Sequence, residues 1–467
     1  MATEESNFRF VSVQNPDDAG DRTARRLARS HAIKHALESK RKLQQQSTLN
    51  FRVPVTPFKE NPSKSASRAQ LTYILASLPP LSRGALDPFQ MLGVDPSKLR
   101  VWLGQNETRR AIKPVFSIAD ELILPNFRLL FRAGLDDPAF LNAIMLTFSF
   151  AVTGVIDSEC LRYQSQALNF IRVRMNFPDE ATSESTLAAI LLLVGVDARL
   201  TMPSQVQLHM NAVQQLLNIC QTQNVCLTDG IKRAIFWQDL TSSVMTGSKR
   251  IVHHTTFAEL EWRRDPFTPN AYTVPTGFEK VSYLLTEELV EVLKDLHALQ
   301  YIRDFARFTG EDMVSMARVD NHQASIQSRL AMLVSSPGVS SFLDCCHLAA
   351  YLCSATLRCK IWPASVVPSH LSLRLLRELQ QANGDSVWDE HPDVLLWSLY
   401  VGGAFAPVGS VRSEYVVLLR LNQHNRFRDR YESWPELLEV LREFIWSEKA
   451  FTSSVKAFWE EVSPRDM

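Results

Sequence analysis

Apolar side chains recur at helical spacing from about residue 68 to the C-terminus, and this pattern limits the fold more than any other feature. In the segment SQVQLHMNAVQQLLNI, Val206, Met210 and Val213 follow one another at steps of four and three, and Leu217 continues the series. Such spacing places side chains on one face of a helix. No convincing run of alternating apolar and polar residues is present in this region. The sequence therefore predicts an all-α, multi-helix globular domain over 68–467.

The same pattern recurs in segments that are separated by Gly, Pro, Asn or Ser. In residues 158–175, the apolar positions at helical spacing are Leu161, Leu168, Ile171 and Met175. We expect these positions to be buried, because each helix must cover one apolar stripe with its neighbours. Further segments of this kind are 183–196, 286–308, 340–362, 370–383, 393–405 and 434–446.

Residues 1–67 differ from this helical body in composition and charge. The first 70 residues contain 13 Lys or Arg and 7 Asp or Glu, whereas the whole chain of 467 residues contains 50 of each kind. The segment 47–67 has three prolines, four serines and no helical period, which is typical of a flexible linker. We therefore expect 1–67 to be a basic leader and linker that is ordered only in part.

Eight basic and only two acidic residues crowd the segment 21–42. Its first cluster consists of Arg22, Arg25, Arg26 and Arg29, whose spacing places four guanidinium groups on one side of a helix. Its second cluster consists of Lys40, Arg41 and Lys42. Two basic clusters separated by about ten residues are typical of a nuclear import signal. Contact with a phosphate backbone and a solvated arm without a partner are the alternatives.

Sequence motifs for catalysis, phosphate binding and metal binding are missing. The chain contains no G-x-S-x-G, G-x-x-x-x-G-K-[ST], G-x-G-x-x-G or H-E-x-x-H motif, and MTGSKR (245–250) is interpreted as a helix end followed by a loop. Cys346, Cys353 and Cys359 are interpreted as buried side chains, and His253 and His254 as exposed loop residues. We therefore predict no catalytic residue, no metal and no cofactor.

The least polar long window, 139–156, has no charged residue, but Asn, Thr and Ser side chains interrupt it. This composition favours a buried helix over a membrane span. The start of the sequence lacks the basic residues and the apolar run of a signal peptide. The seven cysteines, an odd number, are typical of a reduced intracellular protein. We expect no membrane partner.

Several segments, taken in order, resemble the fungus-specific transcription-factor family. FRFVSVQNP and RLARSHAIKH are similar to the leader of a subgroup that lacks the N-terminal binuclear zinc cluster. LHMNAVQQLLNI, IKRAIFWQDLTSSVMTG, LLWSLYVGGAFA, SWPELLEVLREFIW and KAFWEEV are similar to helices of the family's regulatory region. The resemblance covers about 8–42 and 120–462, and it implies a helical scaffold that binds partners or small effectors and controls transcription.

The resemblance does not extend to the binuclear zinc cluster. That cluster requires six cysteines in two C-x2-C-x6-C halves, whereas no two successive cysteines here are three positions apart, and the first is Cys160. The family's zinc-cluster mechanism of DNA reading therefore cannot be transferred to this sequence.

Five residues are candidates for a partner or ligand groove: Trp237, Asp239, Trp397, Gly402 and Gly403. Core packing is the alternative for the tryptophans, and close helix approach is the alternative for the paired glycines, which weaken a helix. A buried Asp239 would need a cation, and the candidates are Arg233 or an arginine from another helix.

These observations predict a nuclear regulator of transcription without its own zinc-cluster DNA reader. Its expected partners are transcriptional proteins or an import receptor, with weak nonspecific DNA contact by the leader. The first alternative is a cytoplasmic helical interaction scaffold, and the second is an enzyme with an unrecognised site. The sequence leaves the oligomeric state open.

Overall fold

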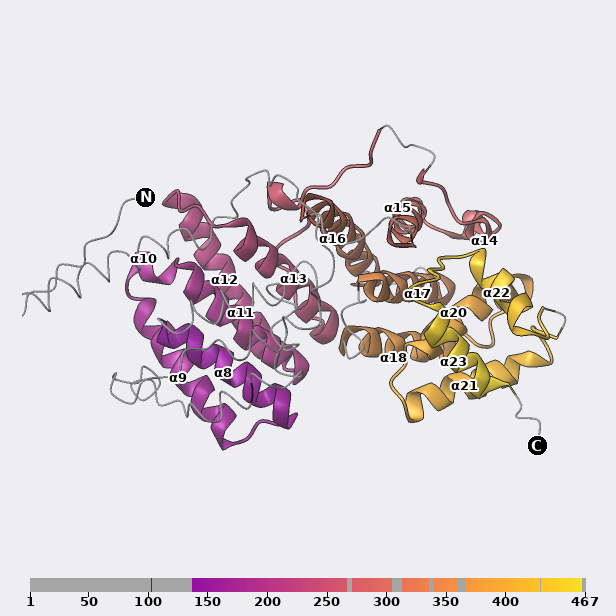
Figure 1. The fold of residues 1–467 in the computed structure, drawn as a ribbon, viewed down its shortest axis with the longest axis horizontal. Helices are drawn as coiled ribbons and strands as arrows, with labels where there is room; N and C mark the ends of the chain where they lie inside the picture. The colour runs from indigo at the N-terminus through magenta and orange to yellow at the C-terminus, as the bar shows by residue number, and fades with distance from the viewer. Residues whose placement is uncertain are drawn as a thin grey trace, which may run out of the picture. The chain divides into compact units, whose positions relative to one another are not determined.

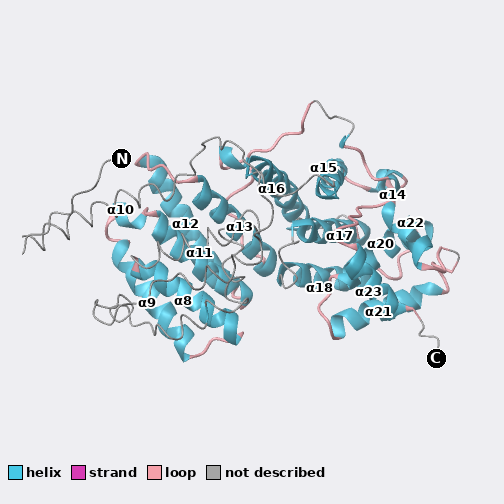
Figure 2. Cartoon of the chain, viewed as in Figure 1, coloured by secondary structure: helices cyan, strands magenta, loops and turns pink. Residues whose placement is uncertain are grey.

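Successive α-helices make up most of the chain that the structure describes, and the segment between Thr246 and Thr276 is a long connection between two of them (Figure 2). This computed structural model describes residues 102, 137–266, 271–304, 313–335, 340–358, 366–428 and 430–463. Within these ranges there is no β-strand, so the predicted all-α fold is confirmed. The predicted boundary at 67/68 and the basic leader lie outside the described residues.

The first set of helices has α11 at its centre (Figure 1). Its members are α8 (Pro138–Thr153), α9 (Ser158–Arg174), α10 (Pro178–Ala181), α11 (Glu184–Arg199), α12 (Pro203–Thr222) and α13 (Asp229–Thr246). Helix α11 packs against α8, α9, α12 and α13, and it is apolar on all sides from Leu187 to Val194. A helix of this composition is stable in water only when other helices surround it. It begins where expected, since the Ser183 hydroxyl accepts a hydrogen bond from the Thr186 amide at 3.3 Å.

Helix α8 confirms the predicted buried helix over most of the uncharged window 139–156. Every residue from Ala139 to Phe150 is buried, whereas 151–156 are partly or fully exposed. The Asp137 carboxylate caps the helix by accepting a hydrogen bond from the Phe140 amide at 3.0 Å. Gly154 ends the helix with φ at 69°, a conformation that glycine adopts without strain. None of the helices that the structure describes has the length and apolarity needed to cross a bilayer.

The second set of helices has α20 at its centre (Figure 1). Its members are α14 (Thr276–Glu279), α15 (Glu287–Asp304), α16 (Met313–Ser335), α17 (Ser341–Arg358), α18 (Val366–Gln381), α19 (Val387–Glu390), α20 (Pro392–Ala404), α21 (Ser410–Gln423), α22 (Trp434–Arg442) and α23 (Thr452–Val462). Short 3-10 helices span Ala258–Leu260 and Ser282–Leu284. All residues of α20 from Val394 to Ala404 are buried against α17, α18, α21, α22 and α23.

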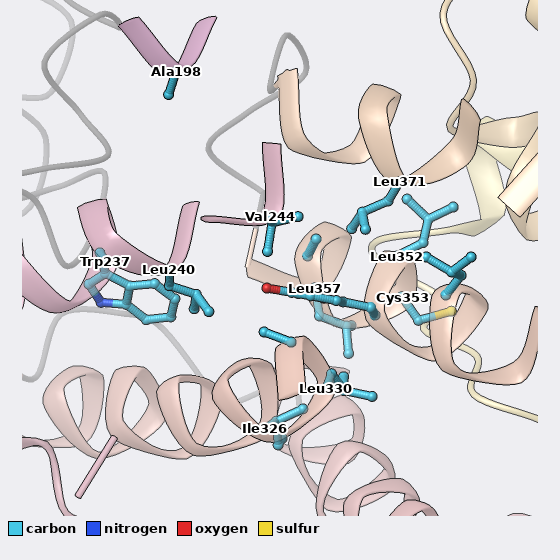
Figure 3. Packing of buried hydrophobic residues seen from close by; sticks show 14 of the residues in the cluster. Ala198, Trp237, Leu240, Val244, Ile326, Leu330, Leu352, Cys353, Leu357 and Leu371 are labelled. Carbon is cyan, nitrogen blue, oxygen red and sulfur yellow. The ribbon is translucent and has the colours of Figure 1, made fainter. Parts of the chain in front are cut away.

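Helix α13 joins the first set to the second, because it also packs against α16 and α18. Figure 3 shows Trp237, Leu240 and Val244 of α13 on one side of this apolar contact. The residues labelled on the other side are Ile326 and Leu330 of α16, Leu352, Cys353 and Leu357 of α17, and Leu371 of α18. The contact is therefore a continuous apolar seam that involves four helices.

The predicted buried stripe of α9 is wrong in part. Leu161 is 54% exposed and Met175 is 40% exposed. The buried face of α9 instead contains Cys160, Tyr163, Ala167 and Ile171. Cysteine and alanine are short, so they allow the close approach of α8, with which α9 makes its main contact. The prediction was misled by the larger apolar side chains, such as Leu161 and Met175, that lie next to this buried face.

The paired glycines of α20 allow two aromatic side chains to contact its backbone. A Cβ atom on Gly402 would lie 2.4 Å from the Tyr415 hydroxyl oxygen, and one on Gly403 would lie 2.1 Å from the Phe458 ring. Both aromatic side chains are fully buried. The surroundings of the two glycines therefore agree with close helix approach, which was the alternative to a groove.

We predict that Gly403→Ala destabilises the protein, although alanine normally stabilises a helix relative to glycine by about 0.5–1 kcal/mol. The added methyl group must displace the Phe458 ring, and overpacking of this kind costs about 1–3 kcal/mol. Gly230→Ala is the matched control, because its Cβ would make only an ordinary contact with Thr228. Urea unfolding measures both free energies. Equal stabilisation by the two substitutions would contradict the packing described.

Candidate functional site

Charged side chains gather inside the protein where α13, α15 and α16 meet the segment 247–266. Helix α13 ends at Gly247, whose φ of 71° confirms that MTGSKR is a helix end followed by a loop. The chain beyond this glycine brings Arg250 back to Asp239 of α13. The segment then contributes Trp262 and Arg264 to contacts with α15 and α16. We call these residues and their partners the polar cluster.

Asp239 forms the first ion pair of the polar cluster. It is 1% exposed, and its carboxylate accepts hydrogen bonds from Arg250 Nε at 3.2 Å and from the Ile251 and Val252 amides at 3.1 and 3.3 Å. Burial raises the pKa of Asp239, and the Arg250 charge opposes this rise. The sequence predicted that a buried Asp239 would pair with a cation, and this prediction is confirmed. The partner is a loop arginine, so both predicted partners, Arg233 and an arginine of another helix, are wrong.

Arg233 pairs instead with Asp320 of α16. Its Nη1 atom lies 2.6 Å from Asp320 Oδ2, and its Nη2 atom donates to the Glu259 carbonyl at 3.0 Å. The indole N–H of Trp237 donates to the same Asp320 oxygen at 3.2 Å. The buried face of α13 thus presents a cation and a neutral donor to one carboxylate.

Asp295 of α15 holds two arginines together. Its Oδ1 atom accepts a hydrogen bond from Arg264 Nε at 2.6 Å, and its Oδ2 atom accepts one from Arg329 of α16. Asp295 is 2% exposed. Arg264 also pairs with Glu291 at 2.7 Å near the surface. These bonds attach the segment 247–266 to α15 and α15 to α16.

Two histidines complete the polar cluster. The His322 ring stacks on the Trp262 ring with centroids 3.8 Å apart, and burial together with the Arg329 charge lowers the pKa of His322 to about 3. Burial and the charges of Arg329 and Arg250 lower the pKa of His254 to about 4. Both imidazoles are therefore neutral at pH 7. His253 is exposed as predicted, but His254 is half-buried, so that part of the prediction is wrong.

The chemistry of the polar cluster is that of compensated buried charge. Its carboxylates accept hydrogen bonds from arginines, which is the arrangement that makes buried charges tolerable. In the described ranges, no group of three or more His, Cys, Asp or Glu side chains could hold a metal ion. Cys346 and Cys353 are buried as predicted, and burial raises the pKa of both thiols. Cys359 lies outside the described residues.

The five groove candidates have different surroundings. Trp237 and Asp239 belong to the polar cluster on α13, whereas Trp397, Gly402 and Gly403 lie on α20. Trp397 is fully buried, donates to the Ile445 carbonyl at 3.2 Å and stacks on Phe444. All five residues are buried. A groove formed by them stays a prediction. The seven basic candidates between Arg22 and Lys42 lie outside the described residues.

Sequence patterns missed most of the polar cluster because they missed α16. The buried positions of this helix include Asp320, His322, Gln323, Ser325, Gln327 and Ser328. Buried apolar residues of the same helix, among them Ala324, Ile326 and Leu330, are interspersed with these polar ones, so α16 has no continuous apolar stripe to detect. One signal could have revealed α16. Its segment is long, is rich in good helix formers and lies between two segments that are clearly helical.

Comparison with known proteins yields one match. A family model described as "Fungal specific transcription factor domain" matches residues 110–467. No curated protein and no solved structure matches the chain. The matched region includes nearly all of the described residues and therefore both sets of helices and the polar cluster.

We predict that Asp239→Asn lowers the free energy of unfolding by about 3–5 kcal/mol, because it leaves the buried Arg250 cation without its carboxylate. Glu261→Gln is the matched control, since the Arg263–Glu261 pair is exposed and worth less than about 1 kcal/mol. Chemical unfolding of both variants compares the two ion pairs directly. A loss for Asp239→Asn no larger than that for Glu261→Gln would count against the polar cluster.

Proposed function

The chain belongs to the family of the fungal-specific transcription factor domain, and from this membership we propose that it is a nuclear regulator of transcription that acts through protein partners. The observation that carries the proposal is the family match over 110–467, which spans most of the chain. The order of the sequence segments that resemble this family's helices supports the same conclusion.

The helical body supports a role as a platform for binding partners. Its two sets of helices are connected by the apolar seam on α13 and by the ion pairs of the polar cluster. Buried ion pairs hold helices in one arrangement, because any other arrangement leaves a charge without its partner. A platform of this kind presents a fixed surface, and we propose that transcriptional proteins bind to it.

The proposed regulator works without a zinc cluster of its own. The cysteine spacing does not fit two C-x2-C-x6-C halves. We propose that the basic segment 21–42 binds an import receptor and makes weak nonspecific contact with DNA, since clustered Lys and Arg attract anionic surfaces. Target genes are then selected by partner proteins.

Fusion of the full chain to a heterologous DNA-binding domain tests the regulatory role. We expect a reporter with binding sites for that domain to change its output relative to the DNA-binding domain alone, because the helical body recruits partners to the promoter. The same reporter without the sites is the control. If the fusion is nuclear and abundant and the output does not change, the proposed function is wrong.

Imaging of the tagged chain tests the import signal. The variant Arg25→Ala, Arg26→Ala, Lys40→Ala, Arg41→Ala should lose nuclear accumulation, because it removes charge from both basic clusters. The matched control replaces four exposed basic residues, Arg263, Arg420, Arg428 and Lys456, with alanine and should stay nuclear. An unchanged distribution of the first variant would argue against an import signal in this segment.

A further inference from the structure

Arg250 is buried with one of its three nitrogens unused. Its side chain is 9% exposed, its Nε atom donates to Asp239, and its Nη1 atom donates to the Ser328 hydroxyl at 2.7 Å. Its Nη2 atom is buried and has no hydrogen-bond partner. A buried donor of a charged group that lacks an acceptor is costly. An acceptor that binds there would therefore gain a strong, charge-assisted hydrogen bond.

Two buried imidazole nitrogens of the polar cluster are also without a hydrogen-bond partner. They are His254 Nδ1 and His322 Nε2. His322 and Arg329 are seven residues apart and therefore lie on one face of α16, where Arg250 contacts the adjacent Ser328. The charge of Arg329 acts on both rings, and the charge of Arg250 acts on His254. Arg329 is thus the common neighbour of both rings.

Cations and carboxylates of the polar cluster are not paired one to one. Asp239 pairs with Arg250, whereas Asp295 pairs with both Arg264 and Arg329. Arg264 has a second partner, Glu291, and these two side chains are 34% and 37% exposed. Both histidines are neutral. Arg329 therefore shares its one buried carboxylate with a second guanidinium group.

We propose that Arg250, His254, His322 and Arg329 form a binding site for a small monocarboxylate. A carboxylate matches the planar geometry of a guanidinium group and supplies one negative charge. A phosphate dianion would bring two negative charges into a buried site whose arginines already contact carboxylates, which disfavours it. The proposal concerns the ligand alone and does not depend on the proposed role in transcription.

A short exposed turn contains His254 of the proposed site. Residues 253–256 close on themselves, because the His253 amide donates to the Thr256 hydroxyl at 2.8 Å and the Thr256 amide donates to the His253 carbonyl at 3.1 Å. His253, Thr255 and Thr256 are exposed, while His254 between them is half-buried. One residue of the proposed site therefore lies in a turn at the protein surface.

Ligand-dependent stabilisation of the full chain tests the site. Acetate and benzoate should raise its unfolding temperature in a saturable manner at constant ionic strength, because a ligand that binds only the folded state stabilises it. Acetamide and benzamide have nearly the same shape without the charge and should have no such effect. Arg250→Lys keeps a cation beside Asp239 but lacks Nη2, and we expect it to weaken acetate binding by about tenfold or more.

Arg442→Lys is the matched control, because Arg442 forms an exposed pair with Glu448. It should respond to acetate as the unmodified chain does. A second readout needs no variant: the imidazole ¹⁵N resonances of His254 and His322 should shift with acetate at the concentrations that stabilise the protein. Equal effects of acids and amides, an unchanged response of Arg250→Lys, or imidazole signals that do not shift would each overturn the proposal.

Discussion

Pairing of buried carboxylates with arginines is the constraint on which the arrangement around α13 depends. Asp239, Asp295 and Asp320 are all nearly inaccessible to water, and each contacts at least one guanidinium group. A carboxylate without such a partner would be too costly to bury. The segment 247–266 must therefore follow α13 closely, and α16 must present Asp320 to it.

The apolar seam and the polar cluster have complementary roles. The seam of α13, α16, α17 and α18 supplies burial of apolar surface, which favours association of helices but sets their register only loosely (Figure 3). The ion pairs at Arg233 and Asp239 restrict the arrangement of the segments that they join, because each pair forms in only one arrangement of charges. A regulator that recruits partners needs such a defined surface, and this is the link we propose between the interior and transcription.

Sequence patterns predicted the fold where apolar periodicity was strong and failed where it was not. The stripes found α9, α11, α12, α15, α17, α18, α20 and α22, because amphipathic or wholly apolar helices have a clear period. Helix α16 was missed, since polar and apolar residues are mixed on its buried faces. Of the site, Asp239 and Trp237 were singled out, but Arg250 was read only as part of a loop. The distance between Arg250 and Asp239 depends on the turn after Gly247, and no helical period encodes it.

A double-mutant cycle on Arg233 and Asp320 tests most directly whether buried ion pairs hold α13 to α16. The measurement is the free energy of unfolding of Arg233→Met, Asp320→Asn and the double variant. The structure predicts a coupling energy of about 1 kcal/mol or more, because the two side chains are in direct contact inside the protein. Additive effects, with a coupling energy of zero, would contradict it.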